Sequence, residues 1–301
     1  MKRLAALMLL LTSAPLFAAA TAWTPFDIED GHIYVDVTLN GQPARALVDS
    51  GASGNAISMA FINEHGIDYT RGREIIVTGI NGQRTTNYVE NMNIGMFGLE
   101  LEIDHLMPYD DAGFDFIIGL PVFNMFVIQI DYPGQQIRLI THDSVDMKKF
   151  ENVRMERATN SIQPAVRVDL NGEDKPWLIF DTGSTGGILL QRMRAEELGW
   201  LERYATEESS IVGFTGDAAG TEQFRLPTMT IGPFTLENVL VTVPAEGGTL
   251  NMDQWRPGES TTGSRIKSSK TAMGILGYDI LKHFIVTVDF KRSMLNLDVP
   301  R

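Results

Sequence analysis

Residues 46–52 read ALVDSGA and residues 178–184 read LIFDTGS, so the chain carries one short pattern twice. In each copy an apolar run, of the kind that forms a buried strand, leads into an aspartate, Asp49 or Asp181. Burying an unpaired carboxylate is costly. Two carboxylates at equivalent places therefore indicate that the two side chains meet in the folded protein.

The similarity extends outward from both aspartates. HIYVDVTLNG (32–41) resembles QPAVRVDLNG (163–172), and DFIIGLPVFNMFVIQIDYPGQQIRLI (115–140) resembles AMGILGYDILKHFIVTVDFKRSMLNLD (272–298). The offset between copies is 131 at Gly41/Gly172 and 132 at the aspartates, but 158 at Gly119/Gly277. The repeat predicts two copies of one fold, the second with an insertion within 244–272.

Local patterns predict that each copy is mostly β with one or two short helices. Val35, Val37 and Leu39 alternate with polar residues, as in a half-buried strand, and Asn40-Gly41 is a hairpin turn signal. Short helices are expected at 59–65 and 191–198, each followed by glycine. The expected division is a signal peptide at 1–22, a first lobe at 23–142, a linker at 143–160 and a second lobe at 161–301.

The chemistry of two adjacent carboxylates explains why a protein would keep both. Two like charges a few ångströms apart do not both ionise, so the pair shares one proton. One carboxylate then acts as a general base towards a water molecule, and the other as a general acid towards a substrate carbonyl. We therefore predict that Asp49 and Asp181 are catalytic.

The neighbours of the aspartates suit a supporting role. Ser50 and Thr182 supply hydroxyls for bonds between the two copies, and Gly51 and Gly183 let backbone amides approach the carboxylates. Ser184 is expected to donate to Asp181 through its hydroxyl, whereas the side chain of its counterpart Ala52 has no donor. On this reasoning Asp49 has the higher pKa and holds the shared proton more often, with a milder acid optimum than a strongly acidophilic enzyme has.

The first residues indicate export. Lys2 and Arg3 precede an apolar run from Leu4 to Leu11, and Ala20-Thr21-Ala22 resembles a cleavage signal. This pattern predicts a secretory signal peptide removed before Trp23, and the apolar run is short for a membrane anchor. A periplasmic or secreted protein is expected.

Composition narrows the function classes. The net charge of −13 disfavours nucleic acid and anionic membranes as partners, and the chain has no cysteine, which excludes disulfides and thiol chemistry. The five histidines show no metal-ligand spacing, so neither a metal nor another cofactor is expected. Asp131 and Asp289 also repeat, and a structural role at strand ends is expected for them.

The doubled Asp-Ser/Thr-Gly pattern, with a later apolar-apolar-Gly in each copy (117–119 and 275–277), resembles the pepsin and retropepsin superfamily of aspartic proteases. The closest likeness is to bacterial retropepsin-like aspartyl protease domains, here in tandem. The resemblance implies two β-barrel lobes with pseudo-two-fold symmetry, a cleft between them, a monomer, and hydrolysis of peptide bonds in peptide or protein substrates. It also implies two flaps, with these substrate-binding residues: Gly79, Ile80, Asn81, Gly82, Gly213, Phe214, Thr215 and Gly216.

Two other functions remain open. A protease-like scaffold of the cell envelope can bind peptides or a partner without cutting them, and a structural envelope protein can use the fold alone. Both copies retain the acid, the hydroxyl and the glycine, which favours an active endopeptidase.

Overall fold

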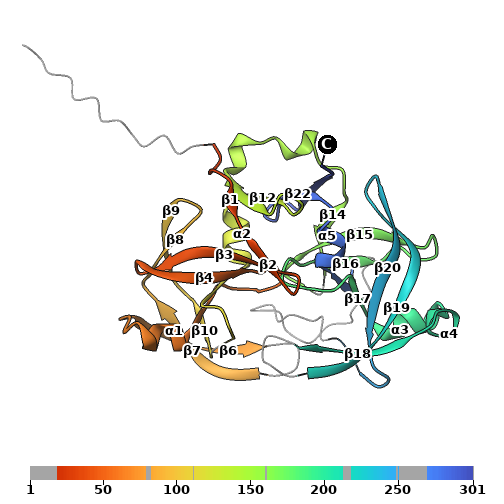
Figure 1. Ribbon diagram of the computed structural model, residues 1–301, viewed down its shortest axis with the longest axis horizontal. Coiled ribbons are helices and arrows are strands. Elements are labelled where there is room, and N and C mark those ends of the chain that lie inside the picture. The colour runs from red at the N-terminus through yellow and green to blue at the C-terminus, as the bar shows by residue number, and fades with distance from the viewer. Residues whose placement is uncertain are drawn as a thin grey trace, which may run out of the picture.

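The computed structural model describes residues 19–78, 83–110, 112–159, 161–212, 218–248, 250 and 270–300, and shows two lobes joined at one side (Figure 1). The predicted fold class is confirmed: the chain is mainly β, with few and short helices. None of the helices in these ranges is long and apolar enough to cross a membrane.

The first lobe is built on a sheet in the order β10-β5-β11-β4-β3-β8-β9, with β2 paired to β3. Two short helices, α1 (Met59–Glu64) and α2 (Leu120–Met125), flank it. The strands are β1 (Thr24–Pro25), β2 (Asp27–Glu29), β3 (His32–Leu39), β4 (Gln42–Val48), β5 (Ala56–Ser58), β6 (Thr70–Thr78), β7 (Gln83–Glu90), β8 (Met92–Met96), β9 (Leu99–Ile103), β10 (Met107–Tyr109), β11 (Phe116–Ile118), β12 (Val127–Asp131) and β13 (Gln136–Ile140).

The second lobe repeats this plan in a sheet of order β14-β15-β16-β21-β17-β20-β19-β18. Its strands are β14 (Met155–Arg157), β15 (Pro164–Leu170), β16 (Trp177–Phe180), β17 (Ile188–Leu190), β18 (Glu207–Val212), β19 (Ala218–Ile231), β20 (Phe234–Pro244), β21 (Ala272–Leu276), β22 (Ile285–Asp289) and β23 (Met294–Asp298). Its helices are α3 (Arg192–Glu197), α4 (Trp200–Arg203) and α5 (Tyr278–Leu281).

The two predicted helices lie close to their expected places. Ser58 caps α1, because its hydroxyl accepts a hydrogen bond from the Phe61 amide. Gly66 and Gly199 follow the two helices with φ of +58° and +66°, in the left-handed region that glycine adopts without strain. The segment expected to be the linker contains 3₁₀ turns and β14, which pairs with β15 and so adds to the second sheet.

The lobes are joined by a five-stranded sheet of order β1-β13-β12-β22-β23. At its centre β12 and β22 run antiparallel, with Ile128 opposite Val288 and Ile130 opposite Val286. The pair between them is Gln129 and Thr287, whose side chains are hydrogen-bonded at 2.9 Å. Equivalent strands thus pair with each other in the sheet that joins the lobes.

Residues beside the predicted cleavage site add to this sheet. Ala20 bridges to Ile140, and the Thr21 amide donates to the Leu139 carbonyl at 2.9 Å. Removal of residues 1–22, which stays a prediction, would take these contacts away from the edge of β13. Residues 1–18 of the predicted signal peptide lie outside the described residues.

Two hairpins extend from the lobes towards each other, β6–β7 from the first and β18–β19 from the second (Figure 1). They occupy the sequence positions where the two flaps were expected. The predicted flap residues themselves, 79–82 and 213–216, lie outside the described residues.

Alternation along the strands before the two aspartates separates two faces of each sheet. Ala46 and Val48 enter the main core, whereas Leu47 faces the other way. Leu178 and Phe180 likewise enter the core, whereas Ile179 does not. Since side chains two apart share a face of a strand, the aspartates continue the face of Leu47 and Ile179, which we call the carboxylate face.

Candidate active site

Asp49 and Asp181 follow β4 and β16 at equivalent points of the two lobes. Each of these strands lies parallel to the strand that carries the later apolar-apolar-Gly sequence, β11 or β21. The Asp49 amide donates to the Ile118 carbonyl at 3.0 Å, and the Asp181 amide to the Leu276 carbonyl at 3.1 Å. A fixed pair of strands therefore holds the backbone of each aspartate.

The two aspartates meet, as the repeat predicts. Their carboxylates lie close enough to share a hydrogen bond, and both residues are half-buried. A Cβ atom added to Gly51 would overlap the carboxylate of Asp181, and one added to Gly183 would overlap that of Asp49. Each glycine thus makes room for the carboxylate of the opposite lobe, in addition to the approach of backbone amides expected from the sequence.

Ser50 and Thr182 make the predicted bonds between the lobes. The Ser50 amide donates to Thr182 Oγ1 at 2.9 Å, and the Thr182 amide donates to Ser50 Oγ at 3.0 Å. The hydroxyls then donate to carbonyls on the opposite strands, Ser50 to Phe180 at 3.1 Å and Thr182 to Val48 at 2.9 Å. Both side chains are buried, so every group in this ring of bonds is satisfied within the protein.

The donors to the two carboxylates differ from those expected. The amides of Gly51 and Ala52 donate to Asp49 Oδ1 at 2.8 and 3.0 Å, and the Gly183 amide donates to Asp181 Oδ1 at 2.8 Å. The hydroxyl of Ser184 makes no hydrogen bond to Asp181, and lies instead beside the backbone of Gly277. The expected stabilisation of Asp181 by Ser184 is therefore not found, because the side chain turns away.

This arrangement reverses the expected difference in pKa. Burial raises the pKa of both carboxyls, and the charge of Asp49 holds the pKa of Asp181 well above its usual range. The hydrogen bonds from the amides of Ala52 and Gly51 lower the pKa of Asp49 and so offset part of the effect of burial, because they favour the ionised carboxylate. We infer that the shared proton resides on Asp181 and the charge on Asp49.

A second pair of equivalent residues reaches across to the opposite lobe. Gln163 is fully buried, and its Nε2 donates to the Gly51 carbonyl at 2.6 Å. Its counterpart is His32, 131 positions earlier, which lies against the backbone of Gly183 and within electrostatic reach of Asp49. Neither His32 nor Gln163 was expected at this site from the sequence. The constant offset between the copies was the signal that could have paired them.

The repeated aspartates Asp131 and Asp289 hold turns, as expected. Asp131 accepts from the Gly134 amide at 2.9 Å, and Asp289 from the Arg292 amide at 2.9 Å. Asp289 is also bonded to His142 Nδ1 at 3.1 Å, while His142 Nε2 lies 3.2 Å from the Asn124 carbonyl. No group of three or more potential metal ligands is found within the described ranges.

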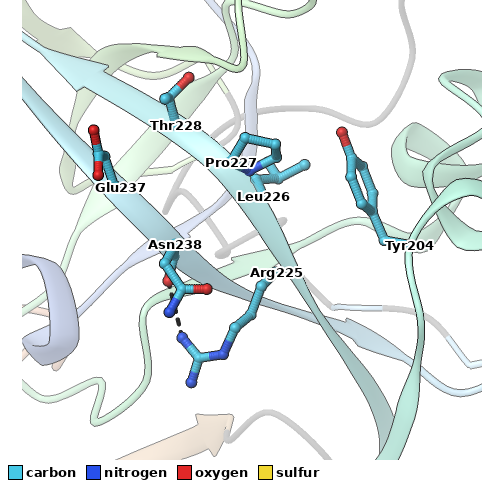
Figure 2. Close-up of a pocket in the computed structure, with 7 residues that line it drawn as sticks. All are labelled: Tyr204, Arg225, Leu226, Pro227, Thr228, Glu237 and Asn238. Carbon is cyan, nitrogen blue, oxygen red and sulfur yellow. Dashed lines mark hydrogen bonds between the residues drawn. The ribbon is translucent and has the colours of Figure 1, made fainter.

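The second lobe also carries a surface hollow of about 560 Å³ (Figure 2). Residues of β19 and β20 line it together with Tyr204, and Arg225 Nη1 donates to the Asn238 carbonyl at 2.9 Å. None of the predicted site residues lines this hollow.

Comparison with known proteins agrees with this geometry. A family model described as aspartyl protease matches residues 35–122 and 166–280, one match for each half of the chain. The two matched regions begin in β3 and β15 and end within or at the helix after the later glycine, α2 and α5. No match was found among curated proteins. Since the two regions cover more than half of the chain, this protein belongs to the aspartyl protease family, as two tandem retropepsin-like domains.

Proposed function

We propose that the protein is an aspartic endopeptidase, in which Asp49 and Asp181 activate one water molecule between the lobes. The observation that carries the proposal is the meeting of two half-buried carboxylates at equivalent strand ends, with a raised pKa at Asp181. A pair of carboxylates that shares one proton provides a base and an acid at the same point.

The reaction follows from that charge distribution. Ionised Asp49 takes a proton from water, and the water oxygen bonds to the carbonyl carbon of the peptide. Asp181 gives its proton to the carbonyl oxygen, which yields a neutral tetrahedral intermediate. Transfer of a proton to the amide nitrogen then allows the C–N bond to break, and the pair returns to its single-proton state.

The ring formed by Ser50 and Thr182 supports this chemistry by fixing the two loops against each other. Catalytic groups need positions that hold to a fraction of an ångström. We further propose that the protein acts as a monomer in the periplasm or after secretion, on peptide or protein substrates. Both lobes of one chain supply the complete pair, which supports the monomer.

The test is cleavage of a mixed peptide library by residues 23–301 across about pH 4–7, with Asp49→Asn and Asp181→Asn as variants. The control is Asp131→Asn, an equivalent change at a repeated aspartate outside the pair. Cleavage by the parent and control, lost in both pair variants, is expected. Peptide binding without cleavage by the parent would instead establish a binding module.

A further inference from the structure

The carboxylate face of the second lobe carries a small apolar cluster, separate from the main core. Ile179, two residues before Asp181, belongs to it, and Ile275 packs beside it from β21. Ile211 of the β18–β19 hairpin also packs against the cluster. Its buried members are Ala158, Ala165, Trp177, Ile179, Leu250 and Ala272, which we call the second-lobe cluster. Its member Ile179 lies on the face that bears the carboxylate.

Leu250 comes from the insertion that only the second copy has. Its side chain is 9% exposed, and its carbonyl accepts a hydrogen bond from Gln191 Nε2 at 3.1 Å. The far end of the insertion is also attached to this lobe, since Lys270 forms an ion pair with Glu156 and its carbonyl accepts from the Thr159 amide at 3.3 Å. The lobe thus holds Leu250 in the cluster that also contains Ile179.

The first lobe has an equivalent cluster on its own carboxylate face. Leu47, two residues before Asp49, packs there with Ile117, Ala56 and Tyr109. Phe114 lies against this cluster, with its ring 5.4 Å from that of Tyr109 and its carbonyl bonded to Tyr109 Oη at 2.8 Å. Phe114 and Leu250 both come from the segment that precedes the apolar-apolar-Gly strand of their lobe.

Each lobe therefore places one apolar side chain of different shape in or against the cluster that contains the residue two before its aspartate. Phe114 is half-buried, whereas Leu250 is buried. A peptide bound across the pair in an extended form directs side chains on the two sides of the cut bond towards different lobes. Because Phe114 and Leu250 differ in shape and burial, the space left for the substrate side chain differs between the two lobes.

We propose that Leu250 is a specificity-determining residue, which restricts the substrate side chain over the second lobe to a small size. The proposal rests on the endopeptidase function. A leucine held in the second-lobe cluster takes the volume that a larger substrate side chain needs. Phe114 sets the preference on the other side of the cut bond, over the first lobe.

The experiment compares cleavage-site profiles of the parent, Leu250→Ala and Phe114→Ala on one peptide library, read by mass spectrometry. Loss of three carbon atoms at position 250 should raise kcat/KM for large apolar residues over small ones by about 10-fold or more, on one side of the cut bond only. Phe114→Ala should change the preference on the opposite side. Gln191→Ala removes the hydrogen bond to the Leu250 carbonyl. It should change the side-chain preference on the same side of the cut bond as Leu250→Ala does, by a smaller factor.

A purely structural role would give a different result. Leu250→Ala would then lower the melting temperature and leave the profile unchanged, or alter both sides equally, and either outcome overturns the proposal. Absence of all cleavage, in parent and variants, refutes the endopeptidase function separately. In that case, binding of peptides with a reduced central bond, measured by fluorescence anisotropy, tests whether Leu250→Ala admits a larger side chain on one side. Equal binding by parent and variant would overturn the role of Leu250.

Discussion

Ser50 and Thr182 each accept a hydrogen bond from the backbone amide of the other, although they belong to different lobes and lie 132 positions apart. Each hydroxyl also donates to the strand that leads into the opposite aspartate. The exchange makes the two active-site loops one rigid unit, and it joins catalytic geometry to the stability of the interface.

Ser50→Ala should destabilise the protein by about 1–3 kcal/mol, because it leaves the buried Thr182 amide and Phe180 carbonyl without partners. Unfolding in urea measures this loss. Ser50→Thr is the matched control, because threonine is the residue at the equivalent position of the other lobe. Its free energy of unfolding should stay close to that of the parent. A loss below about 0.5 kcal/mol in Ser50→Ala would show that the ring of bonds contributes little.

Asp181→Asn should stabilise the protein at neutral pH while it abolishes cleavage. The pKa of Asp181 is raised in the folded protein, so the folded state holds a proton that the unfolded state releases above about pH 4. The free energy of unfolding of the parent therefore falls as pH rises through the raised pKa. The asparagine side chain is neutral at every pH, so the free energy of unfolding of Asp181→Asn does not fall in this way.

Urea unfolding at several pH values measures this difference. The advantage of Asp181→Asn should be largest near pH 7 and shrink towards pH 4. Asp49→Asn should gain less stability, because hydrogen bonds from backbone amides offset part of the rise that burial causes in the pKa of Asp49. The opposite order would place the shared proton on Asp49.

His32→Gln should move the acid limb of the pH–rate profile to higher pH. Burial lowers the pKa of His32, whose ring also interacts with Asp30 and the Gly183 backbone. At a pH below this pKa the ring is protonated, and its positive charge favours the ionised form of Asp49. Without this charge the pKa of Asp49 rises, by an expected shift of less than about one unit. The profile of kcat/KM reports the change.

Glutamine is the chosen replacement because Gln163 holds the equivalent place in the other lobe. His65→Gln is the control, since His65 stacks on Phe61 at the end of α1. An acid limb that is the same in His32→Gln and the parent would mean that the imidazole charge does not act on the pair.

Asp289→Ala should cost more stability than Asp131→Ala, although the two positions are equivalent. Asp289 is fully buried and accepts bonds from the Arg292 amide and from His142, so its loss leaves a buried space and two part-buried donors without this partner, at about 1–3 kcal/mol. Asp131 is partly exposed, and water replaces its partners. Thermal and urea unfolding of the two variants give the comparison, and equal losses would contradict it.

The repeat made the main features of the fold predictable. Alternation around Val35 and the apolar runs before both aspartates correspond to β3, β4 and β16, and the glycines after α1 and α3 mark the ends of those helices. These features depend on neighbours in the chain, which a single sequence displays. The meeting of Asp49 and Asp181 was predictable for a second reason, since two costly buried carboxylates need each other.

Features that depend on side-chain direction were not predictable. The sequence places a hydroxyl at Ser184, but its direction towards Gly277 is set by a contact with a residue 93 positions away in the chain. The second donor to Asp49 is the backbone amide of Ala52, which every residue type except proline supplies, so the residue name carries no signal. The contact from Gln163 to Gly51 spans two lobes and leaves no local pattern.

The register of β12 and β22 shows what the fused chain gains. Ile128 faces Val288 and Ile130 faces Val286, and Gln129 faces its own counterpart Thr287, so the seam has the isologous form of a two-fold dimer interface. In a homodimer every substitution appears on both sides of such a seam. Here the halves are free to differ, as His32 differs from Gln163 and Phe114 from Leu250. A symmetric interface thus carries an asymmetric site, in which the two aspartates hold different charges.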